Sequence, residues 1–257
     1  MYTKILVPLD GSWLSEGILP YACFIAKVLN VPVELLQVID RQTVSAIADP
    51  QVGRYFDPVE ADVKRKSFRY LERVAGSFLD PLVVRGSVKV GNPAEVIVDR
   101  AASQRSTLIA MSTHGRSGLQ RWLLGSVAEK ILSVTTNPLL LVRATDKSVI
   151  STETGLKKVL VPLDGSPFAE QVLPQVTDLA KKLALEVILL QVYDTLARGY
   201  LPYGMDQMTE KIRNEIKTYL EEKVHQLKGE GVPKVSYRSL EGNAAGEIID
   251  IAHATPD

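Results

Sequence analysis

The chain has 257 residues, and its 30 Lys and Arg balance 30 Asp and Glu, so the formal net charge at pH 7 is zero. This balance excludes a general attraction to nucleic acid or to an acidic membrane surface, and no apolar stretch approaches the ~20 residues of a membrane span, so we expect neither partner. The single cysteine, Cys23, excludes an internal disulfide framework and indicates a reducing compartment, so we expect a cytoplasmic protein.

The first part of the chain reads as alternating strands and helices. Residues 5–9 form a continuous apolar run, typical of a strand buried on both faces of a parallel sheet. Ser12 is suited to cap a helix that extends to about Leu29, and Pro20 inside that helix predicts a kink or a later start. The further predicted elements are a strand at 33–38, a loop at 40–57, a helix at 58–78, a strand within 81–90, a helix at 94–105, a strand at 107–111, a helix at 126–135 and a strand at 138–142.

The chain then repeats itself. Lys4–Ser12 recurs as Lys158–Ser166 at an offset of 154, and 20 of the 37 positions from Lys4 to Asp40 are identical at that offset. Such self-similarity indicates a tandem duplication. The second copy matches as far as residues 255–257, and equivalents of residues 108–142 do not follow in the chain.

Strands that alternate with helices predict right-handed crossovers and a parallel sheet. We therefore expect the α/β class, with two tandem Rossmann-like units that each have a parallel five-stranded sheet and helices on both faces. The predicted first domain is 1–144, the linker is 145–155, and the second domain is 156–257. The second domain is expected to be incomplete at its C-terminus, ending before its fourth strand.

The segment 111–126 carries the chemical signal, because it is a glycine-rich loop between an apolar strand and a helix. Glycines let the backbone approach an anion closely, and the free N–H groups of a helix N-terminus supply partial positive charge. His114, Arg116 and Arg121 add local positive charge to an otherwise neutral chain. Asp10, at the carboxyl end of the first strand, is expected to face the same crevice.

Plainer interpretations stay open at this point. A glycine-rich loop can serve turn geometry alone, and residues 10–12 (Asp-Gly-Ser) can be only a turn and a helix cap. Cys23 lies on an apolar helix face and is expected in the core. His225 and His253 have no Cys or His partner at ligand spacing, so we expect no structural metal. No Ser-His-Asp set or carboxylate pair stands out, so no catalytic residue is predicted.

The opening Val-Pro-Leu-Asp-Gly-Ser and the segments 113–118 and 124–130 resemble the universal stress protein family. Nucleotide-binding members carry Gly, two residues, Gly, nine residues, then Gly and Ser or Thr. Gly115, Gly125 and Ser126 fit this pattern, whereas Ser112 stands in the first glycine slot. If that slot needs a positive φ, serine there costs about 1–2 kcal/mol. If it needs only a small residue, the Ser112 hydroxyl can itself reach a phosphate.

The resemblance implies regulatory binding of ATP or AMP and at most slow hydrolysis. Members of the family that bind ATP usually do so with a divalent ion, so Mg²⁺ is the implied companion ion. It also implies a homodimer, or a pseudo-dimer of the two units, formed through the last strand. The competing hypothesis is a non-nucleotide interaction module of the same fold. The residues that the resemblance assigns to the nucleotide are Pro8, Leu9, Asp10, Gln37, Val38, Met111, Ser112, His114, Gly115, Gly125, Ser126 and Val127.

Overall fold

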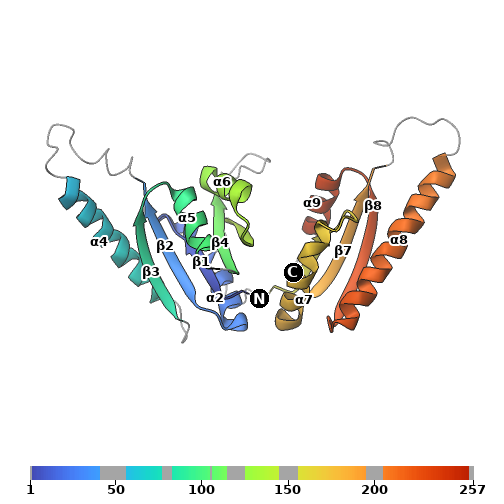
Figure 1. The fold of residues 1–257 in the computed structure, drawn as a ribbon, viewed down its shortest axis with the longest axis horizontal. Coiled ribbons are helices and arrows are strands. Elements are labelled where there is room, and N and C mark those ends of the chain that lie inside the picture. The colour runs from blue at the N-terminus through green and yellow to red at the C-terminus, as the bar shows by residue number, and fades with distance from the viewer. Residues whose placement is uncertain are drawn as a thin grey trace. The chain divides into compact units, whose positions relative to one another are not determined.

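The computed structural model describes residues 2–40, 56–76, 83–104, 106–114, 125–144, 156–194 and 205–254. The chain divides into two compact units, Met1–Thr154 and Gly155–Asp257. Each unit is a parallel sheet with helices on both faces (Figure 1). The predicted linker, residues 145–155, lies outside the described residues.

The first unit confirms the predicted α/β architecture. Its five described strands are all parallel, in the order β3-β2-β1-β4-β5, and every residue of the central strand β1 is buried. Its elements are β1 (Lys4–Pro8), α1 (Trp13–Glu16), α2 (Leu19–Leu29), β2 (Val33–Ile39), α4 (Phe56–Ala75), β3 (Val84–Val90), α5 (Pro93–Ala102), β4 (Thr107–His114), α6 (Ser126–Val134) and β5 (Leu139–Ala144).

Two boundaries differ from the sequence prediction in ways that affect the site. The helix expected from Ser12 is divided into α1 and α2, and Pro20 occupies the first turn of α2, where its missing N–H has no intrahelical acceptor to lose. The strand expected to stop at residue 111 continues as β4 to His114. Ser112 therefore belongs to the sheet, where it is opposite Val142 of β5.

The core of the first unit lies on both faces of this sheet. One cluster of buried side chains joins alternate residues of three strands to α5 and α6. Its buried members are Leu6, Leu36, Ala94, Ile97, Ala101, Ile109, Met111, Ala128 and Ile131. Because side chains alternate across a strand, the intervening residues face α1, α2 and α4 on the other side.

A charged triad lies at the amino-terminal edge of the sheet, where Lys4 and Glu34 are buried and Arg100 is exposed. Glu34 of β2 accepts hydrogen bonds from the Lys4 Nζ at 2.8 Å and from the Arg100 Nε at 2.7 Å. Lys4 is 7% exposed and Glu34 is 6% exposed. At the offset of the repeat, the second unit has the buried apolar residue Ile188 in place of Glu34.

The second unit repeats the architecture of the first over its described length. Its three described strands are parallel, in the order β6-β7-β8 (Figure 1). α7 and α8 share one buried cluster on one face of this sheet, and α9 lies on the other face. Its elements are β6 (Lys158–Pro162), the 3-10 turn η1 (Ala169–Val172), α7 (Leu173–Leu183), β7 (Glu186–Tyr193), α8 (Met205–Gly229), β8 (Lys234–Glu241) and α9 (Ala244–Ala254). Among the described helices of both units, none combines the length and the apolar character that crossing a membrane requires.

The equivalent helices α2 and α7 both end at a residue with a left-handed backbone conformation. Asn30 ends α2 with φ 53° and Ala184 ends α7 with φ 54°. Asparagine tolerates this region, whereas alanine is strained there by about 1–2 kcal/mol. We expect Ala184→Gly to stabilise the protein by about 1 kcal/mol in urea unfolding, and Asn30→Gly to change little. An equal effect of both substitutions would contradict the strain at Ala184.

Candidate functional site

The predicted site residues meet at the carboxyl edge of the first sheet. β1 lies between β2 and β4, so the chain passes first to one side of β1 and later to the other (Figure 1). In open parallel sheets, ligands bind outside the carboxyl ends of the strands at such a switch point. The described residues placed at this edge are Pro8, Leu9, Asp10, Gln37, Val38, Met111, Ser112, His114, Gly125, Ser126 and Val127. Gly115 lies outside the described residues, with the rest of the loop 115–124.

Asp10 is held in a tight turn directly after β1. Its Oδ1 accepts a hydrogen bond from the Ser12 N–H at 2.8 Å, and Gly11 between them has φ +87°. The Ser12 Oγ in turn accepts from the Ser15 N–H at 3.2 Å, which caps α1. The second unit repeats the turn, because Asp164 Oδ1 accepts from the Ser166 N–H at 2.9 Å. The turn therefore fixes the Asp10 carboxylate at the carboxyl edge of the sheet.

The start of α6 has the features of an anion site. Gly125 occupies the N-cap position with φ −62° and ψ 147°, and no side chain caps the helix there. The first intrahelical bond runs from the Glu129 N–H to the Gly125 oxygen at 2.9 Å. The N–H groups of Ser126 and Val127 therefore have no intrahelical acceptor, and the helix dipole places partial positive charge beside them.

Ser112 fits its place in β4 without backbone strain. Among the described residues, the non-glycine positions with positive φ are Asn30, Ser106 and Ala184, so Ser112 has an ordinary strand conformation. The strain of about 1–2 kcal/mol that a serine would have at a positive φ therefore does not arise at Ser112. Ser112 is 8% exposed, and within the described structure its hydroxyl has no hydrogen-bond partner.

Two other predicted residues contribute core side chains. Met111 belongs to the cluster beneath α5 and α6, and Val38 packs against it, so the backbone of these residues, rather than their side chains, is available at the carboxyl edge of the sheet. By strand alternation, the side chains of Gln37 and Ser112 lie on the opposite face, toward α1, α2 and α4.

A cluster near Asp10 was not predicted from the sequence. The Arg73 Cζ on α4 lies 5.3 Å from the Tyr70 ring centroid, and the Arg73 Nη2 lies 3.7 Å from the Glu16 Oε1 on α1. Burial raises the pKa of the Tyr70 hydroxyl well above its usual range, and the neighbouring carboxylates of Glu16 and Asp10 raise it further. The cluster joins α4 to α1, the helix that directly follows the turn with Asp10.

The second unit has the same cluster with a lysine as the cation. The Lys223 Nζ donates to the Glu170 Oε2 at 2.7 Å and lies 5.4 Å from the Tyr219 ring centroid. Glu16 and Glu170 share the offset of 154, but Tyr70 and Tyr219 are offset by 149 because the intervening segment is shorter in the second unit. The sequence could have revealed the two glutamates, because they match at the offset of the repeat. It could not have revealed the two tyrosines in the same way, because their offset differs.

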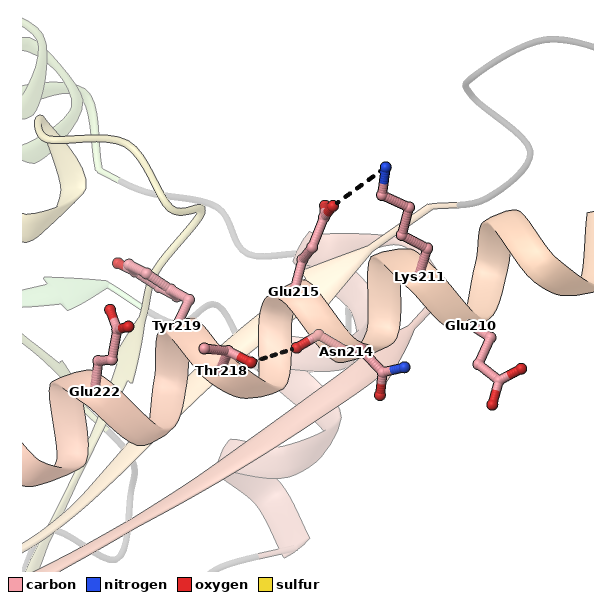
Figure 2. A pocket seen from close by; sticks show the side chains of 7 residues that line it. All are labelled: Glu210, Lys211, Asn214, Glu215, Thr218, Tyr219 and Glu222. Carbon is pink, nitrogen blue, oxygen red and sulfur yellow. Dashed lines mark hydrogen bonds and ion pairs between the residues drawn. The ribbon is translucent and has the colours of Figure 1, made fainter.

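A shallow hollow on the second unit is not part of this site. Figure 2 shows that side chains of α8 line it, including a Lys211–Glu215 ion pair at 3.9 Å. None of the predicted site residues contributes. Its lining residues are Glu210, Lys211, Asn214, Glu215, Thr218, Tyr219 and Glu222. Across the described parts of both units, no group of three or more His, Cys, Asp or Glu side chains is placed to hold a metal ion.

Comparison with known proteins identifies similar chains for both units. The model of the universal stress protein family matches residues 1–143 and 155–256. Universal stress protein YxiE of Bacillus subtilis is 28% identical over 148 residues, which cover 56% of this chain and 100% of that protein. A universal stress protein of Mycolicibacterium smegmatis is 25% identical over 192 residues, which cover 74% of this chain and 63% of that protein.

Several solved structures match nearly the whole chain. The crystal structure of a universal stress protein from Archaeoglobus fulgidus covers 99% of this chain, and the match covers 84% of that chain, with a TM-score of 0.66 and 19% identity. At this identity the match shows that the two chains share a fold.

Proposed function

The chain belongs to the universal stress protein family, and from this premise we propose that its first unit binds an adenine nucleotide, ATP or AMP, in a regulatory role. The observation that carries the proposal is the uncapped N-terminus of α6, which begins at the switch-point edge of the sheet. A phosphate there would accept from the N–H groups of Ser126 and Val127, and from the Ser126 hydroxyl.

The proposed phosphate position implies an orientation of the nucleotide across the carboxyl ends of the strands. With its phosphates at the start of α6, beyond β4, the nucleoside would cross the end of β1 and reach β2. Asp10 lies under that path, and Gln37 and Val38 lie at its far end. The strand conformation of Ser112 supports the proposal, because the serine introduces no strained backbone at the carboxyl edge of the sheet.

Mg²⁺ is compatible with this arrangement. It takes oxygen ligands and keeps several waters, and phosphate oxygens together with the Ser126 hydroxyl are ligands of that kind. The dimer implied by family resemblance stays a proposal, for which the outer edge of β5 offers a pairing surface, since β5 ends the strand order.

Direct detection of a ligand tests the proposal. The protein is purified and denatured, released small molecules are identified by mass spectrometry, and ATP and AMP are titrated by calorimetry with and without Mg²⁺. We expect an adenine nucleotide in the released fraction and saturable binding. If no nucleotide is released and millimolar ATP does not bind, the proposed function is wrong.

Asp10→Ala gives a sharper prediction because the repeat supplies a matched control. A carboxylate that hydrogen-bonds a ligand contributes about 1.5–3 kcal/mol, so we expect the ATP affinity to fall about 10–100-fold. Asp164→Ala removes the equivalent turn carboxylate in the second unit and should leave the ATP affinity unchanged. Equal loss of affinity in both variants would contradict the placement of the site in the first unit.

A further inference from the structure

The same two kinds of buried polar atom are left without a partner in both units. In the first unit they are the Gln37 Oε1 and the Tyr70 hydroxyl, and within the described structure neither has a hydrogen-bond partner. In the second unit the Gln191 Oε1 and the Tyr219 hydroxyl are in the same condition. The glutamines lie on the equivalent strands β2 and β7, and the tyrosines lie on the equivalent helices α4 and α8. Buried polar groups in native proteins nearly always have a partner, so a pair that occurs twice calls for one.

The glutamine of each pair lies against the turn that follows the first strand of its unit. The Gln37 Nε2 lies 3.5 Å from the position that a Cβ on Gly11 would take. The Gln191 Nε2 lies 3.6 Å from the equivalent position on Gly165. Each amide therefore reaches from the second strand of its unit to the Asp-Gly-Ser turn.

The tyrosine of each pair reaches the same turn from the helix. α4 connects the parallel strands β2 and β3, so it begins at the carboxyl edge of the sheet, and helical side chains lean toward the N-terminus of their helix. The Tyr70 ring therefore extends toward this edge. Burial and the nearby carboxylate of Glu16 raise the pKa of the Tyr70 hydroxyl. Burial and the nearby carboxylate of Glu170 raise the pKa of the Tyr219 hydroxyl in the same way, so both hydroxyls keep their protons and can donate.

We propose that each unit holds one ordered water molecule that joins its tyrosine to its glutamine beside this turn. The water accepts a hydrogen bond from the tyrosine hydroxyl and donates one to the glutamine Oε1, which can only accept. It donates its second hydrogen to the carboxylate of Glu16 in the first unit and of Glu170 in the second. This arrangement gives the water three hydrogen bonds, about the usual number for a buried water.

The burial of these atoms and their repetition favour water over a larger ligand. Because the glutamine oxygens and the tyrosine hydroxyls are all buried, a larger molecule could reach them only by displacing side chains. The pair also occurs in the second unit, for which no nucleotide site is proposed. The water sites therefore do not depend on the proposed function. Each joins a strand and a helix of its unit to the Asp-Gly-Ser turn.

A crystal structure of the full chain, at a resolution that shows ordered water, tests the proposal directly. We expect one water within about 3.2 Å of both the Gln37 Oε1 and the Tyr70 hydroxyl oxygen, and one in the equivalent place between Gln191 and Tyr219. The absence of such a water in either unit, or a protein group bonded to either atom in its place, overturns the proposal.

Magnetic relaxation dispersion of oxygen-17 water counts long-lived internal waters in solution. Gln37→Met with Tyr70→Phe removes both partners in the first unit, and Gln191→Met with Tyr219→Phe removes them in the second, so each double variant should lower the count by one. Tyr237→Phe is the control and should leave the count unchanged, because its hydroxyl already donates to the Glu221 Oε1 at 3.0 Å. A count that is unchanged in either double variant overturns the proposal. Should a double variant fail to fold, the crystal structure of the unmodified chain decides.

Discussion

Gly125→Val is expected to abolish ATP binding while the protein still folds. The N-cap backbone at Gly125 has φ −62° and ψ 147°, which a valine adopts readily, so the substitution does not force the chain out of its conformation. A branched side chain at this position would stand before the N–H groups of Ser126 and Val127, where the phosphates are proposed to lie. We expect the affinity to fall by at least about 100-fold, which corresponds to about 2.7 kcal/mol.

Calorimetric titration measures this loss, and circular dichroism with thermal unfolding shows whether the fold persists. Gly125→Ala adds only a Cβ and should give a smaller loss, so the pair forms a graded series. Gly229→Ala serves as the control outside the site, because an added Cβ there meets no atom within 4 Å. An ATP affinity that is the same in Gly125→Val as in the unmodified chain would contradict the placement of the phosphates at α6.

Glu34→Gln is expected to cause the largest loss of stability. Glu34 pairs with Lys4 at 2.8 Å and with Arg100 at 2.7 Å, and Lys4 and Glu34 are both more than nine-tenths buried. Removal of the carboxylate charge leaves the ammonium of Lys4 buried without its partner. Breaking a buried pair in this way typically costs about 3–5 kcal/mol, which urea unfolding measures directly.

The control removes both charges of the buried pair. Lys4→Met with Glu34→Ile replaces the pair by apolar side chains and gives the first unit the residue type that the second unit has at Ile188. Such replacements are often neutral or stabilising, so the double variant should recover most of the stability lost in Glu34→Gln. A double variant as unstable as Glu34→Gln would show that packing, rather than the unpaired charge, causes the loss.

The same triad makes the stability of the first unit depend on pH. Burial alone raises the pKa of Glu34, but hydrogen bonds from Arg100 and Lys4 outweigh it and hold the pKa below its ordinary value of 4.5. A group whose pKa is lower in the folded state stabilises the protein fully above the unfolded value and loses that contribution as the pH falls through the folded value. Urea unfolding between pH 7 and pH 3 should show this loss, and Glu34→Gln should weaken it.

The repeat and the parallel sheet were predictable because they depend on local patterns. Continuous apolar runs marked β1 and β2, and the offset of 154 carried the interpretation from the first unit to the second. Pro20 likewise predicted either a kink or a helix that begins later than Ser12 indicates, and the structure has the later start, because proline is tolerated in the first turn of a helix. These features are set by neighbouring residues, so a single sequence reveals them.

The finer features of the site depend on tertiary contacts that no local pattern encodes. The extension of β4 through Ser112 to His114 comes from pairing with β5, so the conformation of the first glycine slot could not be read from its own residues. The proximity of Tyr70 to Asp10 depends on how α4 packs against the turn after β1. The unpartnered hydroxyl of Ser112 is visible only once the neighbouring donors and acceptors have been placed.

The two units are expected to lose stability differently in acid, because Ile188 of the second unit stands at the position of Glu34 in the first. We expect acid to weaken the first unit through Glu34, whereas the equivalent place in the second unit has no charge to titrate. The carboxyls of the second unit whose pKa is lowered, those of Asp164, Glu170 and Glu230, are more exposed than Glu34 and should contribute less. As the pH falls below about 4.5, the melting profile should separate into two transitions, with the first unit melting earlier. A single two-state free energy then no longer describes the chain. Because the proposed ligand site belongs to the less acid-resistant unit, acidification would release a bound nucleotide before the second unit unfolds.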